Sequence, residues 1–165
     1  MAKLHQASTR GGQQTARQTK QPPMELMQKI KQLKDAHAKN PKDFDVNVEL
    51  GNSYFDIGRY DKAISFYKTA IAVKPDQPPI LIDLGVSYFN LQKSDSALFY
   101  MNQALKVQPD HPQGLYNLGI VYYNMGKRDK AIETWQRLID AHPGSREAQA
   151  AKQFIEQVKN QQKSL

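Results

Sequence analysis

The same residue types return every 34 positions along most of this 165-residue sequence. The recurring residues are Leu50-Gly51, Leu84-Gly85 and Leu118-Gly119; Tyr54, Tyr88 and Tyr122; Ala63, Ala97 and Ala131; and Pro75, Pro109 and Pro143. A repeat of this length cannot bury its apolar side chains alone, so stacked neighbours must share a core. The chain is therefore expected to fold as an array of similar units. Half a unit precedes the array, because Leu33, Ala36 and Pro41 match Tyr67, Ala70 and Pro75.

Each repeat is expected to contain two helices. In the first repeat, Leu50, Tyr54 and Ile57 keep the spacing of one helix face, and Ala63 and Tyr67 begin a second run with the same spacing. A proline follows each second run, and proline ends a helix because it cannot donate a backbone hydrogen bond. The array is therefore divided by turns and is not one long helix.

The turn inside a repeat is marked by glycine at Gly58 and Gly126, but the middle repeat has Gln92 at this position. Glycine adopts the left-handed backbone conformation freely, whereas the same conformation costs other residues about 1–2 kcal/mol. We therefore expect the turn at Gln92 to be adjusted locally.

The landmarks combine into one pattern, which is Leu-Gly, a Tyr three residues later, an Ala nine residues after the Tyr and a Pro twelve after the Ala. At a period of 34, this pattern resembles the tetratricopeptide repeat, and the resemblance covers residues 44–143 in full. It implies an all-α fold, a right-handed α-solenoid of helix-turn-helix repeats. The family's frequent Trp near the repeat start is replaced by Asn47, Leu81 and Leu115, and Met101 stands where Tyr67 and Trp135 stand. These departures should weaken packing locally without threatening the fold.

The repeat divides the chain into an N-terminal half-repeat helix at 24–43, three repeats at 44–77, 78–111 and 112–145, and a C-terminal capping helix at 146–165. Ser145 suits the N-cap of the capping helix, and Glu147 suits its first turn. The apolar stripe that should cover the last repeat, near Trp135 and Leu138, is Ala148, Ala151, Phe154, Ile155 and Val158.

Residues 1–23 are basic and rich in Gln, with almost no large apolar side chain. Such a segment cannot bury enough surface to offset its ordering entropy, so we predict a disordered tail. Residues 7–14 look like an epitope-tag leader, which leaves open whether the whole tail is native.

The formal charge of +7 is concentrated at the ends of the chain, with +6 in residues 1–43, −1 in residues 44–143 and +2 in residues 144–165. A nucleic-acid-binding repeat would need basic residues on the folded part, so nucleic-acid binding through the tail is the less favoured alternative. The sequence has no Cys and no run of about 18 apolar residues, so it encodes no disulfide and no membrane span. The compartment stays open between the cytoplasm and, if an N-terminal anchor or signal was removed, the periplasm.

Catalysis is not expected, and we predict neither a cofactor nor a bound metal. The sequence has no zinc-binding His-x-x-Glu-His, no phosphate-binding glycine loop and no Gly-x-Ser-x-Gly. His37 lies at a helix end, and His111 and His142 lie in turns between repeats. We interpret these three histidines as exposed turn residues and not as a metal or acid-base site.

The first helix of each repeat carries a second set of side chains, turned roughly 100° or more from the Leu-Gly-Tyr stripe. They are Val48, Asn52, Phe55 and Asp56; Ile82, Val86, Phe89 and Asn90; and Tyr116, Asn117, Ile120, Tyr123 and Asn124. In the tetratricopeptide family this face lines a concave groove that receives a peptide or helix, so the resemblance implies such a groove here. Alternatively, Val48, Phe55, Ile82 and Phe89 pack between adjacent repeats, whereas the asparagines gain little from packing.

The expected function is a non-catalytic scaffold that binds a segment of another protein and takes no small-molecule substrate. Aromatic faces bury large areas, and Asn can both donate to and accept from a peptide backbone. Family members that clamp an acidic C-terminus use Lys and Arg at defined positions, which Val48, Asp83, Gln113 and Asn117 occupy here. Because Asp45, Glu49 and Asp56 add negative charge, a neutral to basic, apolar segment is the expected ligand.

Two further interpretations concern assembly. The chain could be a self-assembling module in which the tail or cap of one protomer occupies the groove of its neighbour. The helix near residues 25–40, with the Asn-Pro-Lys-Asp-Phe-Asp that follows it, also resembles entry segments of bacterial tetratricopeptide proteins that assist cell-envelope assembly or cytochrome c maturation. That resemblance would place the scaffold in the assembly of a multiprotein complex.

Overall fold

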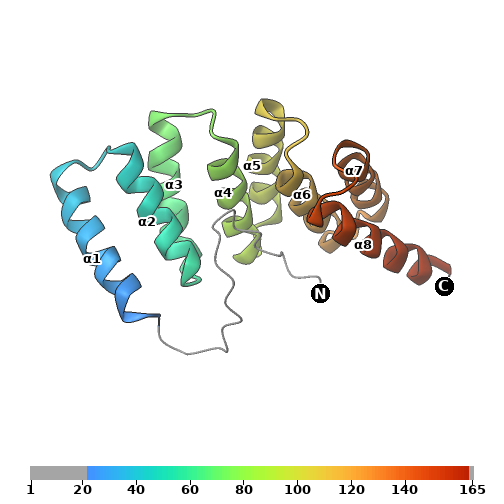
Figure 1. The fold of residues 1–165 in the computed structure, drawn as a ribbon, viewed down its shortest axis with the longest axis horizontal. Coiled ribbons are helices and arrows are strands. Elements are labelled where there is room, and N and C mark those ends of the chain that lie inside the picture. Colours follow the sequence, from blue (N-terminus) through green and yellow to red (C-terminus); the bar gives the residue numbers. More distant parts are fainter. Residues whose placement is uncertain (1–21, 164–165) are drawn as a thin grey trace. The chain divides into compact units, whose positions relative to one another are not determined.

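The computed structural model describes residues 22–163, so the predicted tail lies outside the described residues except for Pro22 and Pro23. This part of the chain contains helices and no strand, which confirms the all-α prediction (Figure 1). The helices are α1 (Met24–Lys39), α2 (Phe44–Asp56), α3 (Tyr60–Val73), α4 (Pro78–Asn90), α5 (Ser94–Val107), α6 (Pro112–Asn124), α7 (Arg128–Ala141) and α8 (Arg146–Lys163). They belong to two compact units, residues 22–75 and residues 76–163, and each unit has its own core.

The first unit is a helix pair, α2 and α3, with α1 packed against α2. The pair is close because Gly51 has no side chain. A Cβ atom at this position would lie 2.5 Å from ring carbons of Tyr67, which is fully buried with Leu50. Beside this contact, Tyr54 stacks on Phe66 with 5.6 Å between the ring centroids. The landmark residues of the repeat therefore form the core of the pair.

The turn before α2 explains one departure from the family pattern. Asp43 is the N-cap of α2, since its carboxylate accepts a hydrogen bond from the amide of Val46 at 3.0 Å. Asn47, at the position of the frequent Trp, donates from Nδ2 to the carbonyl oxygens of Pro41 at 2.9 Å and Asp43 at 2.7 Å. Asn47 is fully buried, so it holds the turn together where a Trp would fill space.

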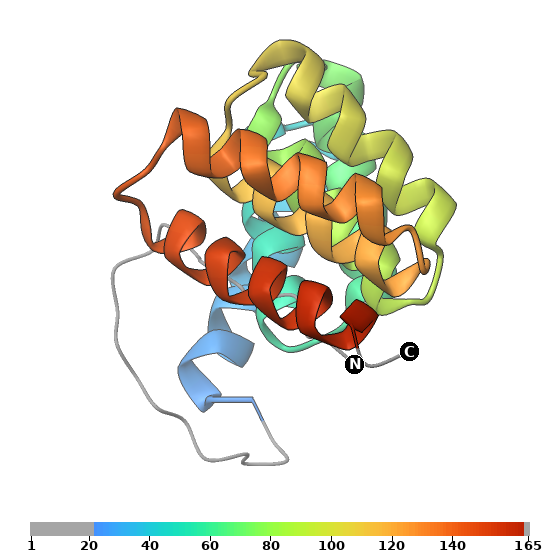
Figure 2. The same ribbon diagram turned by 90° about the vertical axis from the view of Figure 1, so that its right-hand side faces the viewer.

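The second unit contains the pairs α4 with α5 and α6 with α7, and α8 packs on α7 and α6. Figure 2 shows α8 running beside α7 at the end of this unit. Trp135 of α7 is fully buried, and its Nε1 donates a hydrogen bond to the carbonyl oxygen of Tyr116 at 3.1 Å. Gly119 makes this approach possible, because a Cβ atom there would overlap the indole ring.

The last helix begins and packs as predicted for a cap of the last repeat. Ser145 accepts a hydrogen bond from the amide of Ala148 at 3.0 Å, as expected of an N-cap. The ring of Phe154 stacks on Trp135 with 5.3 Å between centroids, and Ile155 is buried. The apolar stripe of α8 thus covers the last helix pair.

The expectation of an adjusted turn at Gln92 is wrong. Gln92 has a φ of +60°, close to the +72° of Gly58 and the +74° of Gly126. Its amide donates to the carbonyl of Phe89 at 2.8 Å, as the amide of Gly58 does to the carbonyl of Phe55 at 2.9 Å. The paired helices and these hydrogen bonds fix the same turn in each repeat, and they outweigh the cost of the left-handed glutamine.

Replacing Gln92 by Gly should therefore stabilise the protein by about 1 kcal/mol, because the strain is removed while a more flexible unfolded chain offsets part of the gain. Urea unfolding followed by circular dichroism measures this change. The reverse substitution in the third repeat, Gly126→Gln, should destabilise by a similar amount. A stability loss in Gln92→Gly would contradict the assignment of strain to this turn.

The histidines also differ from expectation, since His37, His111 and His142 are half-buried and not exposed. The edge of the His37 ring meets Phe66 with 5.4 Å between centroids. His111 is the N-cap of α6, and His142 contacts a backbone carbonyl of the preceding inter-repeat turn. The inter-repeat turns pack against neighbouring elements, which exposed turns would not do.

Candidate partner-binding surface

On α2, the predicted groove residues divide into a buried and an accessible group. Asn52 and Phe55 are only 6% and 8% exposed, whereas Val48 is half-exposed and Asp56 is exposed. The Oδ1 of Asn52 accepts a hydrogen bond from the Tyr67 hydroxyl at 2.9 Å. This bond fixes the amide and leaves its Nδ2 donor without an acceptor among the described residues.

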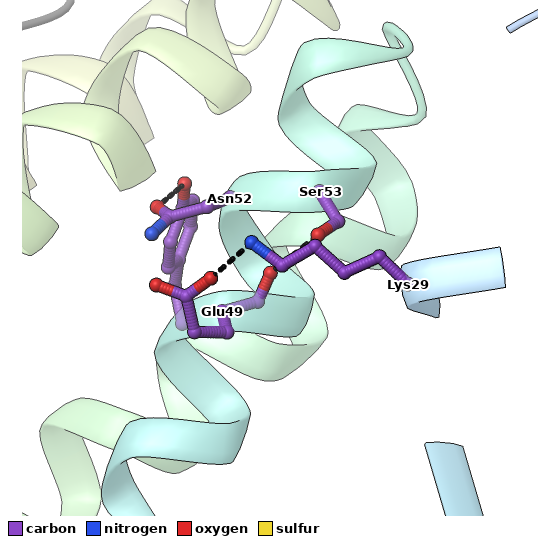
Figure 3. A network of polar contacts seen from close by, with 5 residues as sticks. Lys29, Glu49, Asn52 and Ser53 are labelled. Carbon is purple, nitrogen blue, oxygen red and sulfur yellow. Dashed lines mark hydrogen bonds and ion pairs between the residues drawn. The ribbon is translucent and has the colours of Figure 1, made fainter. Parts of the chain in front are cut away.

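A row of carboxylates lies along the same helix. Asp45, Glu49 and Asp56 follow one another at spacings of four and seven residues, which places them near one helix face. Lys29 of α1 reaches across and pairs with Glu49 at 2.5 Å, and both side chains stay nearly half exposed (Figure 3). The equivalent positions on α4 and α6 carry fewer carboxylates, so the repeat itself does not require this row.

On α4, Ile82 and Val86 are buried, Phe89 is half-buried and Asn90 is exposed. The Nδ2 of Asn90 donates to the carbonyl oxygen of Val86, one turn earlier, at 2.9 Å. The amide is therefore held against its own helix, and its Oδ1 has no hydrogen-bond donor among the described residues.

The face of α6 repeats this arrangement. Tyr123 is half-buried, Asn124 is exposed, and the Nδ2 of Asn124 donates to the carbonyl oxygen of Ile120 at 2.9 Å. Because α4 and α6 pack against each other, the second unit presents two neighbouring helices with the same aromatic and amide ends. The predicted groove residues that remain accessible on α4 and α6 therefore gather at the C-terminal ends of these helices.

The remaining groove residues on α6 are buried. Tyr116, Asn117 and Ile120 are at most 4% exposed, and both polar atoms of the Asn117 side chain lack a hydrogen-bond partner within the described chain. The Phe154 ring of α8 lies against Tyr116 with 6.3 Å between centroids. In this conformation these residues pack inside the unit and cannot touch a partner, as Phe55 and Ile82 also cannot.

Sequence reasoning did not anticipate one contact of this surface. The hydroxyl of Tyr123 donates to Oε1 of Gln161 at 3.2 Å, so the last turns of α8 reach the accessible end of α6. The helix period places Gln161 two turns after Phe154, at the edge of the apolar stripe, but its polar side chain gave no reason to expect a contact with Tyr123. It follows that α8 borders the candidate surface as well as covering the core.

Three family profiles match the chain. A profile described as TPR repeat matches residues 51–92, and two described as tetratricopeptide repeat match residues 78–111 and 113–145. Together they run through more than half of the chain, and the last two coincide with the helix pairs α4–α5 and α6–α7. The chain belongs to the tetratricopeptide repeat family. No curated protein sequence matches it.

Solved tetratricopeptide structures have the same fold. A crystal structure of MamA has a TM-score of 0.69 at 21% identity, over 85% of this chain and 90% of that one. A tetratricopeptide repeat protein from Parabacteroides merdae ATCC 43184 has a TM-score of 0.73 at 22% identity, over 83% of this chain and 55% of that one. The first TPR of Spaghetti (RPAP3), bound to the HSP90 peptide SRMEEVD, has a TM-score of 0.65 at 24% identity, over 71% and 90%. The predicted tetratricopeptide solenoid is thereby confirmed.

Residues 22–163 hold no group of three or more His, Asp or Glu side chains that could bind a metal ion. None of the described helices is long and apolar enough to cross a membrane. Tetratricopeptide repeat proteins are scaffolds for protein interactions, and this chain is one of them.

Proposed function

We propose that this tetratricopeptide repeat protein is a non-catalytic scaffold that binds a segment of a partner protein on the exposed faces of its first helices. The observation that carries the proposal is the repeated pair of a half-buried aromatic ring and an exposed Asn, Phe89 with Asn90 on α4 and Tyr123 with Asn124 on α6. Neither asparagine fills the core, so packing does not account for its presence.

The chemistry of this pair suits an extended polypeptide. An aromatic face buries much surface and has few rotatable bonds to fix. Each Asn holds its Nδ2 on its own helix, which leaves Oδ1 as an oriented acceptor for a backbone N–H of a ligand. Orientation before binding reduces the entropy lost when the partner segment docks.

The charge of the first unit supports a neutral to basic, apolar segment as the ligand. Asp45 and Glu49 remain accessible on α2, and Lys29 pairs with only one of them. An acidic peptide would meet repulsion there, whereas Lys or Arg would be attracted. The proposal extends to a role in assembling a multiprotein complex. The resemblance of the first helix and the turn after it to entry segments of bacterial tetratricopeptide proteins supports this role.

A pull-down with the whole chain as bait identifies a partner, and titration then measures the effect of Asn90→Ala with Asn124→Ala. Each removed acceptor is worth about 0.5–1.5 kcal/mol, so the dissociation constant should rise by about tenfold for the pair. The melting temperature should barely change. Repeating the titration at higher salt should weaken binding if the ligand is basic.

Asn102→Ala is the matched control for this experiment. Asn102 is an exposed residue of α5 whose Nδ2 donates to the carbonyl of Leu98 at 2.8 Å, the same bond that Asn90 and Asn124 make. Its removal should leave affinity unchanged. Unaltered affinity in the double variant would place the binding surface elsewhere. Association of the chain with itself, seen by light scattering over a concentration series, would favour the self-assembly alternative.

A further inference from the structure

The turn between α5 and α6 is held from outside by side chains of the next repeat. Arg137 of α7 donates from Nη2 to the carbonyl oxygen of Pro109 at 3.3 Å. His142, just after α7, contacts the carbonyl oxygen of Asp110 through its Nε2 atom. The following residue, His111, accepts a hydrogen bond at Nδ1 from the amide of Gly114 at 3.3 Å and thereby caps α6. Two imidazoles therefore lie at one turn.

The repeat provides an internal comparison for this cap. The residues that precede the first turn of α2, α4, α6 and α8 are Asp43, Gln77, His111 and Ser145, each 34 positions apart. Asp43 and Ser145 accept a hydrogen bond from the amide three residues later, as His111 does, while the side chain of Gln77 does not. Among these four residues, His111 is the one whose side chain can change its protonation state between pH 5 and 8. The fold itself does not require a titratable residue there.

Protonation would break the cap for a definite chemical reason. Nδ1 of His111 can accept a hydrogen bond only while it carries no proton, and the charged ring has donors on both nitrogens. A cation at the start of α6 would also oppose the positive end of the helix dipole. His142 behaves differently, since a donor at Nε2 suits the Asp110 carbonyl in either charge state.

The groups that face His111 act in both directions. Burial of the imidazole lowers the pKa of His111 from its ordinary value, and the neighbouring His142 lowers it further. Glu147 in the first turn of α8 acts against this by attracting the charged ring. Arg137 and Asp110 also lie at this turn, and Tyr116 lies on α6 near Glu147.

We propose that His111 and His142 form a clasp that holds α6 and α8 in place near neutral pH, and that protonation of His111 loosens it on acidification. The clasp comprises these two histidines, Arg137, and the carbonyl groups of Pro109 and Asp110 that Arg137 and His142 contact. A group whose pKa is lower in the folded state is protonated more readily in the unfolded chain. The stability that the His111 cap contributes is therefore fully present above the pKa of the unfolded chain, about 6.5, and is lost as pH falls below that value.

The clasp can be tested in the whole chain without knowing any partner. The readout is Trp135, the sole Trp of the sequence, which stacks on Phe154 of α8 and bonds to α6. Between pH 7.5 and pH 5, the melting temperature of the natural protein should fall, and its Trp emission should shift to the red before global unfolding. The unfolding constant changes at most tenfold per pH unit for each extra proton bound.

The decisive variant is His111→Ser, which installs the cap that the chain already uses at Ser145. It should keep the stability of the natural protein at pH 7.5 and lose much of the dependence on pH below 6.5. His37→Gln, which removes a histidine in the other unit, should retain that dependence in full. If His111→Ser still loosens around Trp135 as strongly as the natural protein on acidification, or if the natural protein shows no change, the clasp is refuted.

Discussion

Gly119→Ala should lower the free energy of unfolding by about 3 kcal/mol, the upper part of the range for overpacked cores. The added Cβ atom would lie 2.5 Å from Cδ1 and Cε2 of Trp135, a fully buried ring with no room to move. Any shift of the indole would also stretch its hydrogen bond to the carbonyl of Tyr116, which contributes about 1 kcal/mol. Urea unfolding monitored by circular dichroism measures the loss.

The same substitution in the other repeats provides the control. Gly51→Ala should be nearly as damaging, since its Cβ would lie 2.5 Å from the fully buried ring of Tyr67. At Gly85 the nearest atom is Cγ of Met101 at 2.8 Å, and this unbranched side chain can adjust more easily. Gly85→Ala should therefore cost the least of the three. Equal losses at all three glycines would show that helix propensity, and not the facing side chain, sets the effect.

Removal of the Phe154 ring is expected to have the second large effect. Phe154 stacks on Trp135 and lies against Tyr116, so Phe154→Ala should destabilise by about 2–4 kcal/mol, less than a fully buried Phe because Phe154 is only half-buried. Gln153→Ala, at the exposed neighbouring position of α8, should change stability by less than about 0.5 kcal/mol. Thermal and urea unfolding of both variants test this contrast.

Deletion of residues 145–165 should lower stability more than Phe154→Ala does, because it uncovers the apolar surface of the last helix pair. Leu138 and Trp135 are fully buried with α8 in place, and their exposure should promote association of the truncated chain. Size-exclusion chromatography with light scattering detects this. A truncated chain that stays monomeric and equally stable would contradict the capping role.

Most of the fold could be predicted from the sequence because its packing is repetitive. Gly51, Gly85 and Gly119 recur where the paired helices touch, and Ala63, Ala97 and Ala131 recur at fully buried positions of the second helices. Such spacing reflects the helix period directly. The Ser145 cap and the apolar stripe of α8 could be predicted for the same reason, since both are local features.

The candidate surface could be predicted only in part, because burial depends on neighbours that the sequence does not order. Periodicity placed Asn52 and Asn117 on the same face as Asn90 and Asn124, yet the first two are buried. Asn52 is engaged by the Tyr67 hydroxyl, 15 residues away, and Asn117 sits in a fully buried part of α6. The contacts of His142 and His111 were missed likewise, because His142 reaches the carbonyl of Asp110, 32 residues earlier, and the ring of His111 acts as a helix cap.

The different side chains opposite the three landmark glycines limit how repeats of this chain can be exchanged. Gly51 faces Tyr67, Gly85 faces Met101 and Gly119 faces Trp135, so each first helix is shaped for the second helix of its own repeat. Consider a hybrid chain in which repeats are recombined. A junction between the two helices of a repeat would place the indole of Trp135 against a first helix that is fitted to the phenol of Tyr67 or the thioether of Met101. A hybrid joined at Pro75 or Pro109 would keep each pair whole. Recombined or designed versions of this array should therefore fold when the crossover falls at the inter-repeat prolines and fail more often when it falls at the glycine turn.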